Sequence, residues 1–368
     1  MELLLFSFVD VILALINKQL REVNIVVTIS DIAGRMRLST ATVSNALTGK
    51  GRISEQRRSE ILDVAREMGY DFTRIRGSVP KQKSICVIEE QAGITFCDRI
   101  LQGICTAADK YNAQVTIYNL NILTMTDWAY MPPPKMLQES LRKTCNRLNS
   151  SYMGMIYISQ YPRDMTSLLP RLPYPVVCAY AYTNDGIPCI NYDDQQGALL
   201  ATSHLAKLGR KRIAMISGVV DSIPMTKRFA GYQRALVQAG LSFSPEYVCI
   251  GSWNESSGYD AMKQLLALPE RPDAVFCQSD YLAIGAIRAV REAGLRVPED
   301  IAIVGFDDID AASVVDPKLT TIAPPHVEIG MEAVHKLFSI VNKTDDGNNN
   351  GIEQLHRPLQ WRQRLGRR

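Results

Sequence analysis

The sequence predicts a small all-α unit followed by an α/β domain of two lobes, each lobe built on a doubly wound parallel sheet. Two observations lead to this fold class. Three helical patterns with N-terminal caps lie between Thr28 and Tyr70, and from Ser84 onward short apolar strand runs alternate with helical patterns. A chain of 368 residues, with 46% hydrophobic and 21% charged residues, is long enough for two or three domains with proper cores.

The first helix is predicted to begin at Thr28. Thr28 and Asp31 form a capping box, in which the hydroxyl accepts from the Asp31 N–H and the carboxylate reaches back to the start of the helix. Leu38 then lies in the turn, where its side chain is expected to pack into the core, and Ser39 is placed to cap a second helix. One apolar face of the first helix is expected from Ile29, Ile32, Ala33 and Met36.

The second helix, which ends at Gly49, presents a short polar outer face. Its inward or closely packed residues are Ala41, Val43, Ala46 and Leu47, and its outer residues are Thr40, Thr42, Ser44 and Asn45. Hydroxyls and amides of this kind suit a helix in the DNA major groove. A generic helical hairpin would also have a polar outer face, simply because water covers it.

A third helix, capped by Ser54 and ending at Gly69, makes the unit compact. Its apolar side is expected from Ile61, Leu62, Ala65 and Met68. Positive charge gathers in this part of the chain: residues 24–83 hold eleven basic and six acidic residues, whereas the whole chain has a net charge of +3. Such a concentration is typical of nucleic-acid binders, although a solvated basic face would count the same.

These motifs resemble the lactose repressor (LacI) family of bacterial transcription regulators. The resemblance rests on T-I-x-D-I-A from Thr28, S-x-A-T-V-S-x-A-L from Ser39, G-x-G-R-I-S from Gly49 and A-x-E-M-G-Y from Ala65. It implies a homodimer that reads a near-palindromic operator with paired helix-turn-helix units. By that resemblance, the residues near bases are Thr40, Ala41, Asn45 and Arg52, and those near phosphates are Thr28, Ser39, Thr42, Ser44 and Ser54.

Two features depart from the family pattern. Arg37 stands where the family's turn normally has glycine, and a positive φ there would strain an arginine by ~1 kcal/mol or more, so a differently shaped turn is the alternative. The linker, residues 71–83, lacks the usual hinge-helix pattern. Ile75 or Val79 could serve as the side chain that wedges into the minor groove, but Gly77 and Pro80 argue against a stable helix.

Residues 1–23 form an apolar extension of uncertain status. The run from Leu3 to Ile16 is preceded by Glu2 and interrupted by Asp10, whereas a signal peptide requires a basic start. The run is also shorter than the about 20 apolar residues that a bilayer span needs. We therefore expect a mispredicted translation start or an extra packing helix, with no membrane partner and a cytoplasmic location.

From Ser84 onward the chain alternates strands and helices, a rhythm that we divide into two halves at Cys189. Strands are expected at 85–90, 114–119, 153–159 and 175–182, then at 189–194, 212–217, 247–253, 274–279 and 301–308. Helices are expected at 99–111, 135–149, 195–208, 227–239, 259–268 and 281–293. Two such halves make a clamshell with a cleft at the carboxyl ends of the strands. The family resemblance extends over Ser84 to Val341 and implies the fold of periplasmic sugar-binding proteins.

Polar and aromatic residues that follow the strands are the candidates for effector binding. The family pattern places Arg228, Asp280, Asp307 and Trp253 in the second half, a set that suits polyols because carboxylates accept from hydroxyls and an indole stacks on sugar C–H groups. Asp280 could instead cap the helix that starts at Tyr281, and Asp307 and Asp308 could cap the next segment. Arg228 could form an ion pair that stabilises a lobe.

The first half offers fewer candidates. Phe96 and Tyr161 follow strands where ligand contacts are expected, but aromatic residues after strands are as often core residues. Tyr180 occupies a position where many family members carry Asp, so effector contacts there are expected to differ.

The sequence favours neither a metal site nor an enzyme. The eight cysteines form no C-x-x-C pair and have no histidine at metal-ligand spacing, and Cys86, Cys178 and Cys277 lie in apolar runs as buried hydrophobes would. No phosphate-binding, dinucleotide-binding or nucleophile-elbow motif is present, and we expect no cofactor.

The predicted organisation is therefore an extension at 1–23, a helix-turn-helix domain at 24–70, a linker at 71–83, and an effector-binding and dimerisation domain at 84–343. Residues 344–368 are expected to form a loop, a last short strand within LQWRQR and a basic tail. The resulting hypothesis is a repressor controlled by a small molecule, with a sugar favoured over a purine. A sugar-binding protein of the same fold without a DNA-binding role is the alternative.

Overall fold

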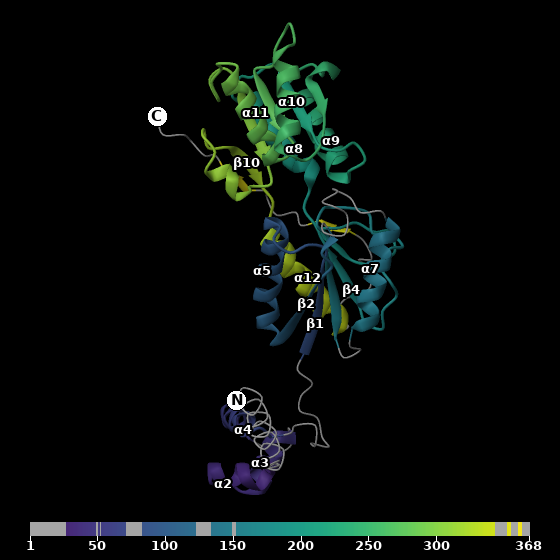
Figure 1. Ribbon diagram of the computed structural model, residues 1–368, viewed down its shortest axis with the longest axis vertical. Helices are drawn as coiled ribbons and strands as arrows, with labels where there is room; N and C mark the ends of the chain where they lie inside the picture. Colours follow the sequence, from purple (N-terminus) through teal and green to yellow (C-terminus); the bar gives the residue numbers. More distant parts are fainter. Residues whose placement is uncertain are drawn as a thin grey trace, which may run out of the picture. The chain divides into compact units, whose positions relative to one another are not determined.

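The computed structural model describes residues 27–48, 51, 53–70, 83–122, 134–148 and 152–342, and the backbone of 352–354 and 360–362. The chain divides between Gln82 and Lys83 into two compact units, a helical one and an α/β one (Figure 1). This confirms the predicted fold class. Residues 1–23, residues 71–82 of the expected linker and most of 344–368 lie outside the described residues.

The helical unit consists, in its described part, of α2 (Ile29–Met36), α3 (Thr40–Thr48) and α4 (Glu55–Glu67). The capping box is confirmed, since the Thr28 N–H donates to Asp31 Oδ2 at 2.7 Å and the Asp31 N–H donates to Thr28 Oγ1 at 3.3 Å. The Ser39 hydroxyl likewise accepts from the Thr42 N–H at 3.0 Å at the start of α3. Ser54 caps α4 as predicted.

A single apolar core holds these helices together. Its buried members are Ile32, Ala33, Val43, Ala46, Leu47, Ile61, Ala65 and Tyr70, and Leu38 packs against them from the turn. Ala41, one of the residues expected to face inward or pack closely, is instead exposed, because it lies on the outer face of α3 beside Thr40. In the described part of the helical unit, one face of α3 is thus exposed rather than packed.

The α/β unit contains two sheets. The first has the order β11-β5-β4-β3-β1-β2 and is parallel throughout; the second has the order β12-β10-β9-β8-β6-β7 and is parallel except for β12. The first-sheet strands are β1 (Lys83–Glu89), β2 (Ala113–Asn119), β3 (Gly154–Ile158), β4 (Val176–Ala179), β5 (Cys189–Asn191) and β11 (Ile352–Gln354). The second-sheet strands are β6 (Ile213–Ser217), β7 (Val248–Ile250), β8 (Ala274–Cys277), β9 (Ala302–Phe306), β10 (Thr320–Ala323) and β12 (Gln360–Arg362).

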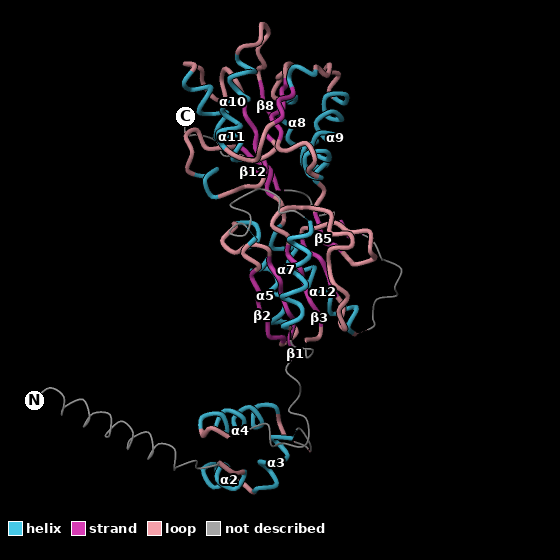
Figure 2. The backbone as a smooth tube through the Cα atoms, turned by 45° about the vertical axis from the view of Figure 1, so that its right-hand side comes forward, coloured by secondary structure: helices cyan, strands magenta, loops and turns pink. Residues whose placement is uncertain are grey.

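Helices cover both faces of each sheet. Figure 2 shows this for the second lobe, where the strands lie between helices on either side. In the first lobe, α5 (Thr95–Lys110) and α12 (His326–Val341) pack on one face and α7 (Pro134–Arg147) on the other. In the second lobe, α8 (Asp194–Lys207) and α9 (Ile223–Gln238) lie opposite α10 (Glu255–Leu266) and α11 (Asp280–Glu292). The buried strands read as apolar runs because both of their faces are covered.

The division of the chain between lobes differs from the sequence prediction. We expected the second half to begin at Cys189, but β5 pairs with β4 in the first sheet, with Cys178 opposite Cys189. Strand rhythm alone does not reveal which neighbour a strand pairs with. In addition, β10 and α12 were not predicted as elements, and α12 returns the chain to the first lobe. The short strand expected within LQWRQR is confirmed as β12.

Helices α5 and α12 approach each other unusually closely. A Cβ on Gly103 of α5 would lie 1.9 Å from the Val327 carbonyl oxygen, and one on Gly330 of α12 would lie 1.9 Å from the Ile100 carbonyl oxygen. Only glycine fits at both positions, because each helix rests directly on the backbone of the other. The first lobe is therefore completed by residues far apart in the sequence.

None of the helices in the described part of the chain is long and apolar enough to cross a membrane. The apolar run from Leu3 to Ile16 belongs to the residues that the structure does not describe.

Candidate functional site

The free face of α3 holds most of the residues predicted to read DNA. Ser39, Thr40, Ala41 and Asn45 are exposed, and Thr42 and Ser44 are half-buried. Asn45 lies against Gly51, where an added Cβ would be 3.1 Å from Asn45 Nδ2. Thr28 and Ser54 are exposed at the starts of α2 and α4, and Arg52 lies outside the described residues. The structure thus brings the α3 candidates together on one polar surface of the helical unit.

The turn between α2 and α3 carries Arg37, where the resemblance leads us to expect glycine. Arg37 adopts the left-handed conformation, with φ 54° and ψ 44°, and its N–H donates to the carbonyl oxygens of Ala33 and Gly34. The alternative of a differently shaped turn is therefore wrong: this turn keeps the left-handed geometry with an arginine in it. This conformation costs a residue with a Cβ about 1 kcal/mol or more relative to glycine.

In the α/β unit, a cavity of about 190 Å³ lies between the two lobes. Five of the six residues predicted to bind an effector line it: Phe96, Tyr161, Arg228, Trp253 and Asp307. Its other lining residues are Gly93, Ile94, Thr95, Pro162, Tyr180, Pro224, Ser279, Tyr281 and Ile309. The family pattern and the positions after predicted strands therefore pointed to the cavity. They missed Ser279 and Tyr281, which could have been found by their position after β8.

Arg228 is the centre of a buried polar network. Its guanidinium donates to Asp194 Oδ1 at 2.7 Å, to the Tyr192 hydroxyl at 2.9 Å and to the Gln278 carbonyl oxygen. Burial lowers the pKa of Arg228, but the facing oxygens of Tyr192 and Asp194 help to raise it well above its usual value. The guanidinium is therefore a fixed cation whose protein partners already use most of its N–H groups.

Asp307 faces the cavity with a loosely paired carboxylate. Its Oδ1 lies 3.4 Å from Arg228 Nη2, a longer contact than those of Arg228 with Asp194 and Tyr192. Burial raises the pKa of Asp307 to about 7, although the charge of Arg228 acts in the opposite direction. Asp307 and Asp308 both have positive φ angles, 104° and 53°, so this turn after β9 is strained. A ligand hydroxyl could take the place of the weak contact to Arg228.

The structure does not place Asp280 at the cavity. Its carboxylate is fully buried and accepts from the Ile309 N–H at 2.9 Å and from the Thr321 hydroxyl at 2.5 Å. It does not cap α11 either, because Ser279 is the N-cap. Asp280 instead binds the segment that follows the strained turn of Asp307 and Asp308.

Trp253 forms one wall of the cavity because Gly218 has no side chain. A Cβ on Gly218 would lie 2.1 Å from Trp253 Cε2. The indole also lies 5.9 Å from the Arg228 guanidinium carbon, measured to the ring centroid. The flat face of Trp253 is thus held against the backbone at the end of β6.

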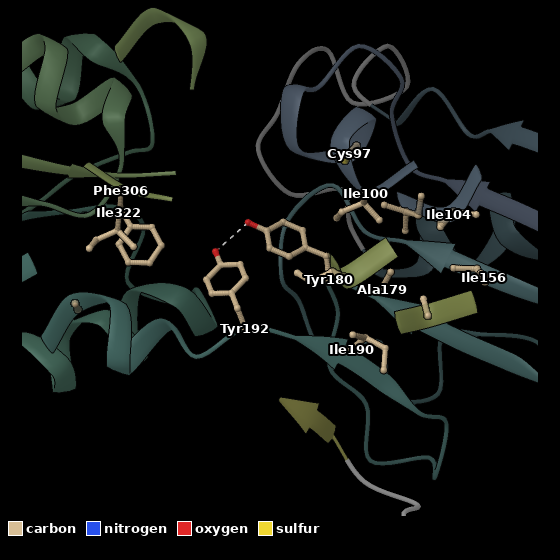
Figure 3. Packing of buried hydrophobic residues seen from close by; sticks show 14 of the residues in the cluster. Cys97, Ile100, Ile104, Ile156, Ala179, Tyr180, Ile190, Tyr192, Phe306 and Ile322 are labelled. Atoms are coloured by element: carbon tan, nitrogen blue, oxygen red, sulfur yellow. Dashed lines mark hydrogen bonds between the residues drawn. The ribbon is translucent and has the colours of Figure 1, made fainter. Parts of the chain in front are cut away.

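Aromatic side chains of the first lobe form the opposite wall. Phe96 lies 6.1 Å from Tyr161 and 5.7 Å from Tyr180, between ring centroids. Tyr180 in turn stacks on Tyr192, and their hydroxyls are 3.3 Å apart (Figure 3). Because Tyr192 also stacks on Phe306 of the second lobe, this column joins the cores of the two lobes.

His326 lies behind this wall, at the start of α12. Its side chain is buried against Phe96, Tyr180 and Tyr192, and neither ring nitrogen has a hydrogen-bond partner among the described residues. Burial, together with the charges of Arg99 and Arg228, lowers the pKa of His326 to about 3. The imidazole is therefore neutral at physiological pH.

Two basic side chains form polar contacts between the lobes beside the cavity. Arg99 of α5 donates to the Asp308 carbonyl oxygen at 3.1 Å and pairs with Asp310 at 3.2 Å. Lys227 of α9 reaches the Tyr182 hydroxyl at 3.3 Å. No cluster of three or more potential metal ligands occurs among the residues that the structure describes. The cavity itself is lined by hydrogen-bonding groups, such as Arg228 and Asp307, and by aromatic rings.

The comparisons with known proteins agree with both units. Residues 28–71 match the model of "Bacterial regulatory proteins, lacI family", and residues 202–364 match a periplasmic binding protein-like domain. The HTH-type transcriptional repressor CytR of Escherichia coli is 35% identical over 83% of this chain and 87% of its own length. The chain belongs to the LacI family. Within it, the catabolite control protein A of Priestia megaterium is 30% identical over 92% of this chain and 98% of its own length.

Solved structures of LacI-family proteins share this fold. A Lac repressor bound to ONPG aligns with a TM-score of 0.68 at 24% identity, over 92% of this chain and 99% of its own. A complex of the regulator CelR with cellobiose aligns with a TM-score of 0.58 at 24% identity, over 87% and 94%.

Proposed function

We propose that this LacI-family protein is a transcriptional repressor that binds operator DNA through α3. A small molecule bound between the lobes lowers or raises its affinity for the operator. The observation that carries this proposal is the free polar face of α3, in the same chain as an inter-lobe cavity. A solute-binding protein would have no use for a capped helix-turn-helix with this surface. We assign DNA reading to residues 24–70, and effector binding and dimerisation to residues 84–343.

The proposed contacts on DNA fall into two groups. Asn45, Thr40, Ala41 and Arg52 approach base edges, where an amide such as that of Asn45 can pair with adenine. Small hydroxyl residues, namely Thr28, Ser39, Thr42, Ser44 and Ser54, approach phosphates and set the register of the helix without reading sequence. Two copies of the chain would place their α3 helices about one helical turn of DNA apart, which requires a homodimer and a near-palindromic operator.

The proposed effector is a sugar. Asp307 offers a carboxylate that accepts from hydroxyls, Arg228 supplies a fixed positive charge, and Trp253 offers a flat face for C–H groups. The CelR structure, which contains cellobiose, supports a sugar in a cavity of this fold. The five aromatic rings that line the cavity also suit a flat purine, which is the second candidate: Phe96, Tyr161, Tyr180, Trp253 and Tyr281.

Two experiments on the full chain test the proposal. Selection from a random duplex library should enrich a near-palindromic sequence whose binding weakens steeply with salt. Absence of any salt-sensitive binding would favour the solute-binding alternative instead. Thermal unfolding against a panel of sugars and purines should show stabilisation by at least one sugar. Stabilisation by a purine but by no sugar would reverse the choice of effector.

A further inference from the structure

We propose that Arg37 is a DNA-phosphate contact of this protein, one that its sequence has gained in exchange for the glycine expected in the turn. The inference rests on the proposed function, since it adds a contact to the same DNA-binding surface. It starts from the backbone: Arg37 is held at φ 54° by two hydrogen bonds from its own N–H, a conformation that glycine adopts without strain.

In the described part of the chain, the Arg37 side chain forms no hydrogen bond or ion pair that would offset this backbone strain. Arg37 is exposed, and its guanidinium makes no hydrogen bond or ion pair with any residue that the structure describes. The arginines of α4 differ in this respect. Arg57 pairs with Glu60 at 2.7 Å, Arg66 pairs with Asp63 at 2.7 Å, and Arg58 donates to the Ala46 carbonyl oxygen at 3.1 Å. Arg37 therefore carries a charge that the described part of the helical unit does not neutralise.

Arg37 lies close to the surface of α3 that we assign to DNA, so a DNA phosphate can pair with its charge. Arg37 lies two residues before Ser39, so their Cα atoms are at most about 7 Å apart, within the span of an extended arginine side chain. Ser39 begins the polar surface of α3 that we assign to the operator. A free guanidinium beside that surface would reach a phosphate of the same duplex, where arginine binds two oxygens at once. Strained residues of this kind persist where function uses them.

The test compares four forms of the full chain: wild type, Arg37→Gly, Arg37→Asn and Arg37→Lys. Glycine and asparagine both suit the left-handed turn and remove the charge, whereas lysine keeps the charge and the strain. Binding to a mixed-sequence duplex of about 30 base pairs is measured by fluorescence anisotropy over a series of KCl concentrations around the physiological range. Because the contact is to phosphate, the operator sequence is not required.

For each helix-turn-helix unit bound, we expect Arg37→Gly and Arg37→Asn to bind about five- to tenfold more weakly at about 0.1 M KCl, with a salt slope smaller by about 0.9. Arg37→Lys should keep the wild-type slope. The helical unit of Arg37→Gly should unfold at a higher temperature than that of the wild type, so weaker binding cannot be due to misfolding. Equal slopes in all four proteins would overturn the inference and leave the proposed function intact. No salt-dependent binding by the wild type would overturn both.

Discussion

Replacing His326 by phenylalanine should remove much of the acid sensitivity of the α/β unit. The imidazole is buried among three aromatic rings with no hydrogen-bond partner in the described part of the chain, and its pKa is about 3. The unfolded chain binds the proton first, because the pKa of histidine there is about 6.5. The stability contribution of neutral His326 is therefore complete above about pH 6.5 and is lost as the pH falls toward 3.

Integrating this difference from about pH 8 to about pH 5 gives a loss of about 2 kcal/mol for the wild type that the His326→Phe variant would not show. A phenyl ring fits the aromatic surroundings and leaves no polar atom unpaired, so the variant should be at least as stable as the wild type at about pH 8. The measurement is urea unfolding of the full chain at several pH values between these limits, followed by tryptophan fluorescence and circular dichroism. Parallel loss of stability in both proteins over this range would refute the placement of a neutral imidazole in this core.

Three further predictions concern the effector cavity and the DNA-binding surface of α3. Effector affinity should fall about tenfold from about pH 8 to about pH 6 as Asp307, with a pKa of about 7, takes up a proton. In calorimetric titrations of Asp307→Asn, the effector affinity should hardly depend on pH over this range. Gly218→Ala should push Trp253 into the cavity and weaken the effector at least tenfold, and unchanged affinity would contradict the assigned wall. Asn45→Ala should lose about 1–3 kcal/mol of discrimination at one base pair, whereas Arg57→Ala should weaken all duplexes alike; equal losses for both variants on singly substituted duplexes would exclude base readout by Asn45.

Much of the helical unit could be predicted because its signals are local. A capping box, as at Thr28, depends on residues three positions apart, and helix periodicity identified most of the core. The exception, Ala41, is small enough to lie on either face of α3. The conformation of Arg37 was not predictable, since the cost of a left-handed arginine is small enough for the surrounding turn to impose it.

The cavity was predicted less completely because it depends on long-range contacts. The rule that binding residues follow the strands placed Asp307 at the cleft, directly after β9. Arg228 lies within α9 and was placed at the cleft by the family resemblance instead. The same rule could not distinguish Asp280, whose carboxylate turns inward to bind the Ile309 N–H instead of facing the cleft. His326 has no local signal at all, because its surroundings come from segments more than a hundred residues away.

The contact between α5 and α12 also bears on how the protein is made. Between the end of β5 and the start of α12 the ribosome must add roughly 130 residues, all of the second lobe up to β10. At about 5–20 residues per second, this takes on the order of ten seconds. During that time the nascent first lobe has no α12, and the α5 surface around Gly103 is open to water. We therefore expect the second lobe, except for β12, to be synthesised before α12 can close the first.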